Sequence, residues 1–79
     1  MKATILVRPK PGILDAQGEA VQSSLRQLGF AVDEARVGRV IDLELENGDA
    51  EQARVDLERM CEQLLANPLI ETFEIAVDQ

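Results

Sequence analysis

Residues 41–46 alternate strictly between apolar and acidic side chains, and this alternation constrains the fold more than any other stretch of the chain. Ile41, Leu43 and Leu45 fall on one side of an extended backbone, and acidic residues fall on the other. Because successive side chains of a β-strand point to opposite faces, the pattern predicts a strand that is buried on one face and exposed to solvent on the other.

Two more strands and two helices are predicted around this segment. Residues 3–8 form a short aliphatic run, and residues 71–77 alternate in the same way as residues 41–46. Apolar residues recur at spacings of three and four from about residue 16 to residue 28, and again from residue 50 to about residue 66, which is typical of helices with one covered face. Asp49 is the expected N-cap of the second helix, and Asn67-Pro68 ends it.

The segment before the alternating strand gives a weaker signal. Residues 31–46 are predicted to form a hairpin that turns at Gly38-Arg39. Val32, Ala35 and Val37 do not share one period-2 phase, so a bulge or a poorly formed edge strand is expected in the first half.

A hinge is predicted between the first strand and the first helix. Pro11-Gly12 is a turn dipeptide, and Asp15 stands where a helix N-cap belongs. Gly18 lies inside the first turn, where glycine costs about 1 kcal/mol relative to alanine. It shares its stripe with Val21 and Leu25, so close packing of the first helix against the sheet is the expected reason for it.

The order of these elements is β-α-β-β-α-β, which is the ferredoxin-like pattern of the α+β class. The expected architecture is a four-stranded antiparallel sheet with two helices on one face, built by residues 1–79 as a single domain. The other face of the sheet should be solvated and carry mostly polar residues, namely Thr4, Leu6, Arg8, Asp42, Glu44, Thr72 and Glu74.

Charge and cysteine content narrow the partners and the compartment. The 79 residues carry a formal net charge of −7 and contain a single cysteine, Cys61. An acidic chain is not attracted to phosphate backbones or to anionic lipid, so nucleic acid and membrane are not expected partners. One cysteine cannot form an internal disulfide, which fits a cytoplasmic location.

The chain lacks several of the side chains that enzymes often use for catalysis. The chain has no histidine, tyrosine or tryptophan, so the commonest general base is missing and no Ser-His or Cys-His pair can form. Cys61 lies on the apolar stripe of the second helix and is expected to be a buried structural thiol. No spacing of cysteines or carboxylates matches a metal site, and no catalytic, cofactor or metal residue is assigned.

Four basic residues flank the hinge and the predicted hairpin: Arg8, Lys10, Arg36 and Arg39. If another subunit approaches this region, these side chains could form ion pairs or bind a phosphate. Solvated surface is the commoner outcome for such residues.

Three blocks of sequence resemble a known family. They are Lys10 with Leu14-Asp15, Gln17-Gly18 and Ala20-Val21; Arg36-Val37-Gly38-Arg39; and Met60-Cys61-Glu62 with residues 64–68 and Ile70-Glu71. Their order and spacing resemble the PurS subunit of phosphoribosylformylglycinamidine synthase over nearly the whole chain. Ala16 departs from the pattern, because many members have proline there.

The resemblance implies a non-catalytic small subunit of a three-part enzyme of purine biosynthesis. Its partners would be a glutaminase subunit (PurQ), which releases ammonia, and a synthetase subunit (PurL), which uses ATP and Mg²⁺ to convert formylglycinamide ribonucleotide (FGAR) to the amidine (FGAM). The small subunit would join the two and assist ammonia transfer, with no cofactor of its own. The candidate subunit-interface residues are Lys10, Asp15, Gln17, Arg36, Arg39, Asn67 and Glu71.

The chain is also expected to self-associate, and two alternative functions are open to it. A homodimer or homotetramer is expected, both from the resemblance and because unpaired edge strands in so small a domain favour pairing between protomers. One alternative is a ferredoxin-like regulatory module that binds a small molecule. The other is a small phosphatase-like enzyme that holds phosphate with Arg8 or Lys10, although the loop after the first strand lacks a glycine-rich cradle.

Overall fold

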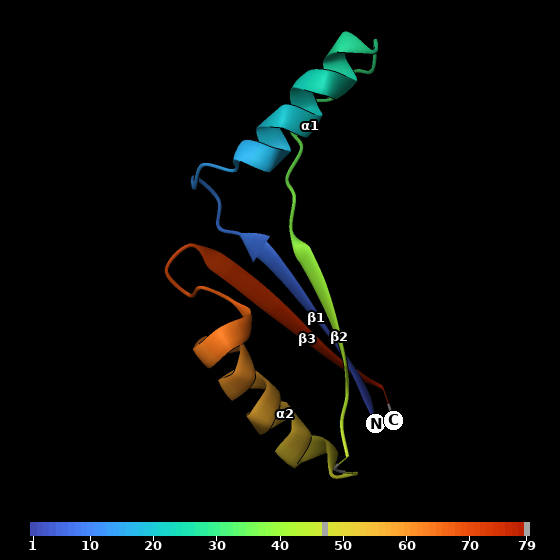
Figure 1. Ribbon diagram of the computed structural model, residues 1–79, viewed down its shortest axis with the longest axis vertical. Helices are drawn as coiled ribbons and strands as arrows, with labels where there is room; N and C mark the ends of the chain where they lie inside the picture. The colour runs from blue at the N-terminus through green and yellow to red at the C-terminus, as the bar shows by residue number, and fades with distance from the viewer. Residues whose placement is uncertain (47, 79) are drawn as a thin grey trace.

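The computed structural model describes residues 1–46 and 48–78. The elements along the chain are β1 (Lys2–Pro9), α1 (Ala16–Gln27), β2 (Arg39–Glu44), α2 (Ala50–Met60), the π-helical turn η1 (Cys61–Leu65) and β3 (Glu71–Asp78). Figure 1 shows the sheet with one helix beside it and the other beyond its end.

The sheet has three antiparallel strands in the order β2-β1-β3. β1 is central, and its last residues lie opposite the beginnings of both neighbours, with Val7 opposite Arg39 and Pro9 opposite Glu71. The prediction of a four-stranded sheet is therefore wrong, because residues 31–37 form no strand.

Side chains of α1 form hydrogen bonds with backbone groups that a fourth strand would have used for pairing. The backbone N–H of Ala35 donates to the side-chain oxygen of Gln22 at 3.3 Å. Arg26 donates to the carbonyl oxygens of Val32 and Asp33, each at 2.8 Å. These bonds hold the returning segment against its own helix, which satisfies its polar backbone without a sheet.

The core lies between the sheet and α2. Ala3, Ile5 and Val7 point from β1 toward Leu57 and Cys61, and all five are buried. Full burial of an aliphatic side chain of this size is worth about 1.5–3 kcal/mol, so these few contacts anchor α2 to the sheet. The expectation that Cys61 is a structural thiol is confirmed by its burial.

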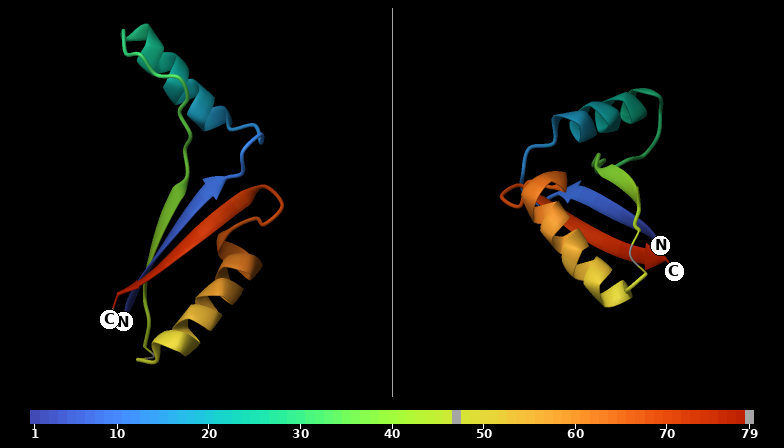
Figure 2. Two further views of the ribbon diagram at one scale, coloured as in Figure 1. Left: turned by 180° about the vertical axis from the view of Figure 1, so that it is seen from behind. Right: turned by 60° about the horizontal axis from the view of Figure 1, so that its bottom comes forward.

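The first helix does not cover the sheet. Figure 2 shows α1 projecting from the end of the sheet in both views, while α2 lies along the sheet face. The expectation of two helices on one face is therefore wrong for this chain. The hinge at residues 10–15 directs α1 away, and no residue of α1 belongs to the core cluster, whose buried members come from β1, α2, η1 and Ala66.

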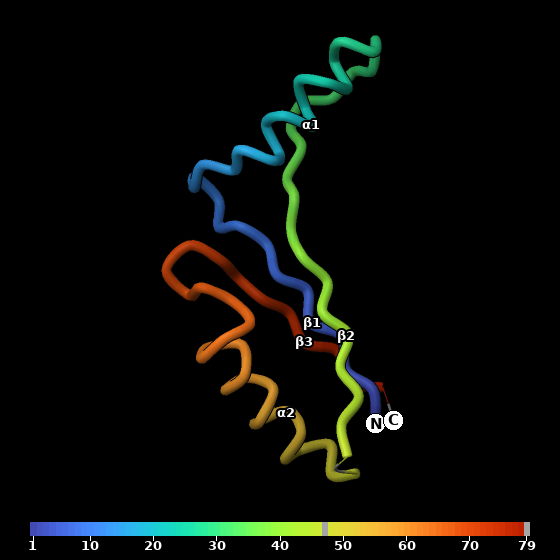
Figure 3. Tube along the Cα trace, in the orientation of Figure 1, coloured from blue at the N-terminus to red at the C-terminus, as the bar shows by residue number. Residues whose placement is uncertain are grey.

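Residues 16–38, which comprise α1 and the segment that returns beside it, are called the arm below. The tube in Figure 3 shows the two limbs of the arm running side by side. The molecule measures 48 × 25 × 14 Å and has a radius of gyration of 15.7 Å. A compact domain of this length would have a radius of gyration of about 12 Å, so the arm makes the chain markedly elongated.

Candidate subunit interface

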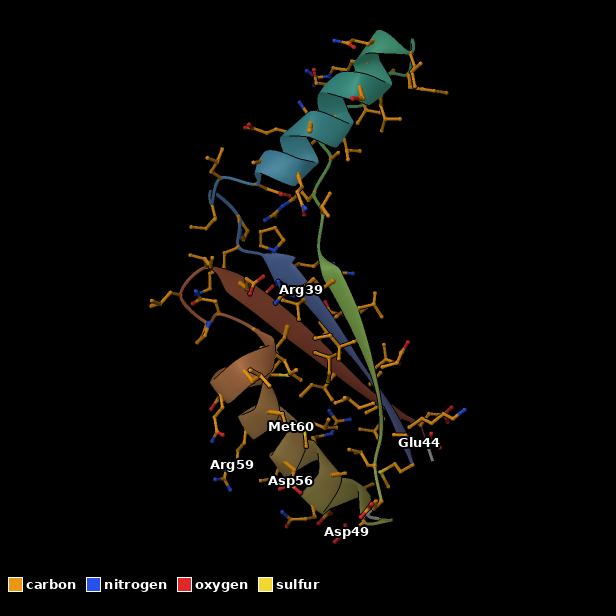
Figure 4. The ribbon with its side chains drawn as sticks, viewed as in Figure 1. Arg39, Glu44, Asp49, Asp56, Arg59 and Met60 are labelled. Atoms are coloured by element: carbon orange, nitrogen blue, oxygen red, sulfur yellow. The ribbon has the colours of Figure 1, made fainter. Side chains whose placement is uncertain are left out.

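The seven residues predicted from sequence lie at one end of the sheet, where β1 ends and both β2 and β3 begin. Lys10 follows β1, Asp15 and Gln17 begin α1, and Arg36 precedes β2. Arg39 and Glu71 are the first residues of β2 and β3, and Asn67 lies in the loop before β3. Figure 4 places Arg39 at this end, and Glu44 marks the opposite end.

Asp15 closes the base of the arm. Its Oδ1 accepts from the backbone N–H of Gly18 at 3.0 Å, which caps α1, and its Oδ2 accepts from the backbone N–H of Val37 at 2.8 Å. The Val37 and Gly18 bonds lower the pKa of the Asp15 carboxyl, and the nearby charge of Arg36 acts in the same direction. One carboxylate thus joins the start of the helix to the end of the returning segment.

The close approach at the base of the arm leaves no room for a side chain at Gly18. A Cβ at Gly18 would lie 2.3 Å from Oδ2 of Asp15 and 2.5 Å from the backbone oxygen of Ala35. The expectation that Gly18 allows the helix to pack on the sheet is therefore wrong: the close approach is within the arm.

Arg39 and Glu71 join the starts of β2 and β3. Arg39 Nη1 lies 2.8 Å from Glu71 Oε2, and Arg39 Nη2 donates both to Glu71 Oε1 at 3.1 Å and to the Leu65 carbonyl oxygen at 2.7 Å. The backbone N–H of Asn67 also donates to Glu71, at 2.8 Å. The Arg39 guanidinium, followed by the Asn67 bond, lowers the pKa of Glu71.

The hydrogen bonds of Arg39 and Glu71 lie at the C-terminal end of η1. At the end of η1 the backbone N–H of Ala66 donates to the Cys61 carbonyl oxygen. Arg39 donates to the carbonyl oxygen of Leu65, the last residue of η1. A cation at a helix C-terminus is favourable because the carbonyl dipoles point toward it. Arg39, Glu71 and Asn67 therefore have an internal structural role, whatever their role toward a partner.

The other three predicted residues make fewer internal contacts. The Arg36 guanidinium donates to the Pro9 carbonyl oxygen. Lys10 uses its backbone N–H to bond the Ile70 carbonyl oxygen at 2.9 Å. Among residues 1–46 and 48–78, no hydrogen bond involves the side chain of Lys10 or that of Gln17.

Several contacts near this end of the sheet have no local signal in the sequence. Arg8 pairs with Glu74 at 2.9 Å across β1 and β3 on the outer face of the sheet. Arg26 and Gln22, which hold the arm together, cannot be recognised from the sequence, because their partners are backbone groups whose position depends on the arm.

Two clefts flank the same end of the sheet. One has a volume of about 420 Å³ and lies between β1 and residues 36–40, with Leu6, Arg8, Arg36 and Val40 in its walls. The other, of about 240 Å³, lies between the hinge and the loop before β3, with Ile13, Leu14 and Ile70 among its walls. Leu14 is 75% exposed, so apolar surface is available to a partner here.

Reactive groups are scarce in the described part of the chain. Burial, followed by the charges of Glu62 and Glu58, raises the pKa of the Cys61 thiol, which keeps it protonated. Among the described residues, no group of three or more His, Cys, Asp or Glu could hold a metal ion. No helix in the described ranges is long and apolar enough to cross a membrane.

Comparison with known proteins identifies relatives that match almost the whole chain. The family model "PurS: Phosphoribosylformylglycinamidine (FGAM) synthase" matches residues 2–79. The PurS subunit of Methanocaldococcus jannaschii is 38% identical over 99% of this chain and 95% of its own length. That of Synechocystis is 47% identical over 87% of this chain and 70% of its own.

Solved structures show the same fold. PurS from Bacillus subtilis has a TM-score of 0.88 at 35% identity, covering 99% of this chain and 98% of its own. A chain in the structure of PurLQS from Thermotoga maritima has a TM-score of 0.86 at 34% identity, covering 95% of this chain and 93% of its own. The chain described here therefore belongs to the PurS family, the small subunit of phosphoribosylformylglycinamidine synthase in purine biosynthesis.

Proposed function

We propose that this chain is a non-catalytic assembly subunit that joins the glutaminase and synthetase subunits and assists the transfer of ammonia between them. The observation that carries the proposal is the combination of family membership with an elongated shape, 48 Å in its longest dimension, in which an arm projects from a small core. An extended body with exposed apolar residues both on the arm, such as Leu28, and in the loop before β3, such as Leu69, presents surface to more than one neighbour.

The structure of PurLQS from Thermotoga maritima supports this assignment of partners. In the proposed complex, PurQ supplies ammonia, PurL uses ATP and Mg²⁺ to convert FGAR to FGAM, and this subunit needs no cofactor of its own. The proposed location is the cytoplasm.

Self-association is a second part of the proposal. The arm exposes Val21 at 43%, Leu28 at 73% and Phe30 at 59% of their surface. On the sheet face that α1 leaves uncovered, Ile41 and Leu43 of β2 are only half-buried. We propose that a second copy covers these two apolar surfaces, because an amphipathic helix with no partner in its own chain is stabilised by burying its stripe elsewhere.

Reconstitution tests the assembly role. The synthetase and the glutaminase are mixed with FGAR, ATP, Mg²⁺ and glutamine, with and without this chain, and FGAM formation is measured. FGAM formation from glutamine should require this chain. Equal rates in its absence would refute the proposal.

A further inference from the structure

The 420 Å³ cleft between β1 and residues 36–40 combines positive charge with apolar walls. Leu6, Pro9 and Val40 form the apolar part, and Val40 is 64% exposed. Arg8, Arg36 and Arg39 line the same cleft. The formal net charge of the chain is −7, so a cleft lined by three arginines differs from the predominantly acidic surface of the molecule.

Arg8 and Arg36 are both available to an incoming anion. Arg36 donates to the Pro9 carbonyl oxygen, and among the described residues it forms no ion pair with a carboxylate. Arg8 is paired with Glu74, but the two side chains are 58% and 67% exposed. An ion pair so exposed contributes little, so a carboxylate of another molecule can replace Glu74 at small cost.

The third arginine of the cleft has a different role. Arg39 is bound to Glu71 and to the Leu65 carbonyl oxygen. It therefore forms part of the cleft wall, but its charge is already paired with that of Glu71. Gly38 brings the residues before β2 close to β1, since a Cβ there would lie 2.2 Å from the Val7 carbonyl oxygen. The cleft is thus held in place by the start of β2.

We propose that this cleft is a docking site for a protein segment in which a carboxylate side chain lies next to an apolar one, carried by another subunit of the synthase. The proposal rests on the assembly role above. Arginine can bind a carboxylate through two parallel N–H donors, and arginine beside apolar surface is typical of the residues that dominate protein interfaces. A free phosphate would leave Leu6, Pro9 and Val40 without contacts, so a protein segment fits the cleft better.

The test compares two double variants that remove the same charge. Arg8→Gln/Arg36→Gln alters the cleft, and Arg54→Gln/Arg59→Gln alters the exposed surface of α2, where Figure 4 shows Arg59 pointing away from the sheet. Affinity of each for the synthetase and glutaminase is measured by sedimentation at about 50 and about 300 mM salt, which spans strong and weak screening. The cleft variant should bind at least about 10-fold more weakly at low salt, and the control within about 2-fold of the unaltered chain.

Thermal unfolding and two further variants distinguish loss of binding from loss of folding. Thermal unfolding is compared for all variants, and Arg8→Gln alone serves if the double variant does not fold. Arg36→Lys, which keeps the charge and loses the forked geometry, should give an intermediate affinity.

Three results would overturn the docking site. The first is unchanged affinity of the cleft variant for the partner subunits. The second is binding of inorganic phosphate by the isolated chain that disappears in the cleft variant. The third is loss of self-association, seen by light scattering, while partner binding is unchanged. If the unaltered chain does not bind either subunit, the assembly role fails first; if it binds and the cleft variant binds equally, only the docking site fails.

Discussion

The carboxylate of Asp15 accepts a hydrogen bond from the backbone N–H of Val37, 2.8 Å away and 22 residues further along the chain. The same carboxylate caps α1 through Gly18. Both limbs of the arm therefore meet at this one side chain.

Asp15→Asn should open the base of the arm. An amide has one acceptor oxygen where the carboxylate has two, so it can keep only one of the two backbone bonds. The Val37 amide should then exchange with solvent about 10-fold faster in hydrogen-exchange NMR. Glu19→Gln, the same loss of charge on an exposed residue of α1, is the control. Unchanged exchange at Val37 would show that the Asp15 bond does not hold the arm.

Gly18→Ala tests the close approach inside the arm. Alanine normally stabilises a helix interior by about 1 kcal/mol relative to glycine. Here its Cβ would lie 2.3 Å from Asp15 Oδ2, so we expect destabilisation of about 1–3 kcal/mol in urea unfolding, as for other overpacked sites. Gly48→Ala, where a Cβ would have no heavy atom within 4 Å, should change stability by less than about 0.5 kcal/mol. A stabilising effect at Gly18 would contradict the described geometry.

Stability should fall at acid pH through two carboxylates. The pKa values of Asp15 and Glu71 are both below their ordinary values of 3.8 and 4.5. Each folded-state pKa is depressed, so its contribution is present above the ordinary value and is lost as pH falls through the folded pKa. The urea midpoint should be level above about pH 5.5 and decline below about pH 4.5. In Asp15→Asn/Glu71→Gln the decline should be smaller, and an equal decline would assign the acid sensitivity to other groups.

Removing apolar residues from the arm should weaken self-association. Val21→Ser/Leu28→Ser takes away two exposed side chains of the arm, and the mean mass by light scattering at micromolar concentration should fall toward that of a monomer. Leu64→Ser, at a side chain of η1 that is 83% exposed, is the control and should leave the mass unchanged. A monomeric mass for the unaltered chain would refute the self-association part of the proposal.

The elements of this fold could be predicted well where the information is local. Strict alternation located β2, and the capping residues Asp15 and Asp49 mark the starts of both helices. The strand expected at residues 31–37 does not form because its polar backbone bonds side chains of α1, and those contacts depend on where the arm lies. The apolar stripe of α1 indicated that something should cover the helix, but periodicity cannot distinguish the chain's own sheet from a partner.

The residues proposed for the subunit interface lie together in the structure, and their contact with a partner stays a prediction. All seven residues singled out from the sequence lie at one end of the sheet. Their internal roles were not predictable, because the Arg39–Glu71 pair joins residues that are 32 positions apart. Such a pair depends on how the starts of two strands lie in space, which the local pattern of side chains does not determine.

The most direct test of the assembly role compares two sources of ammonia for the same synthetase. With ammonium salt supplied in excess, FGAM formation should be the same with or without this chain, since synthesis belongs to PurL. With glutamine as the only source, FGAM formation should depend on this chain and rise to saturation as it is added. Full glutamine-dependent activity in its absence, or loss of ammonia-dependent activity without it, would contradict the account.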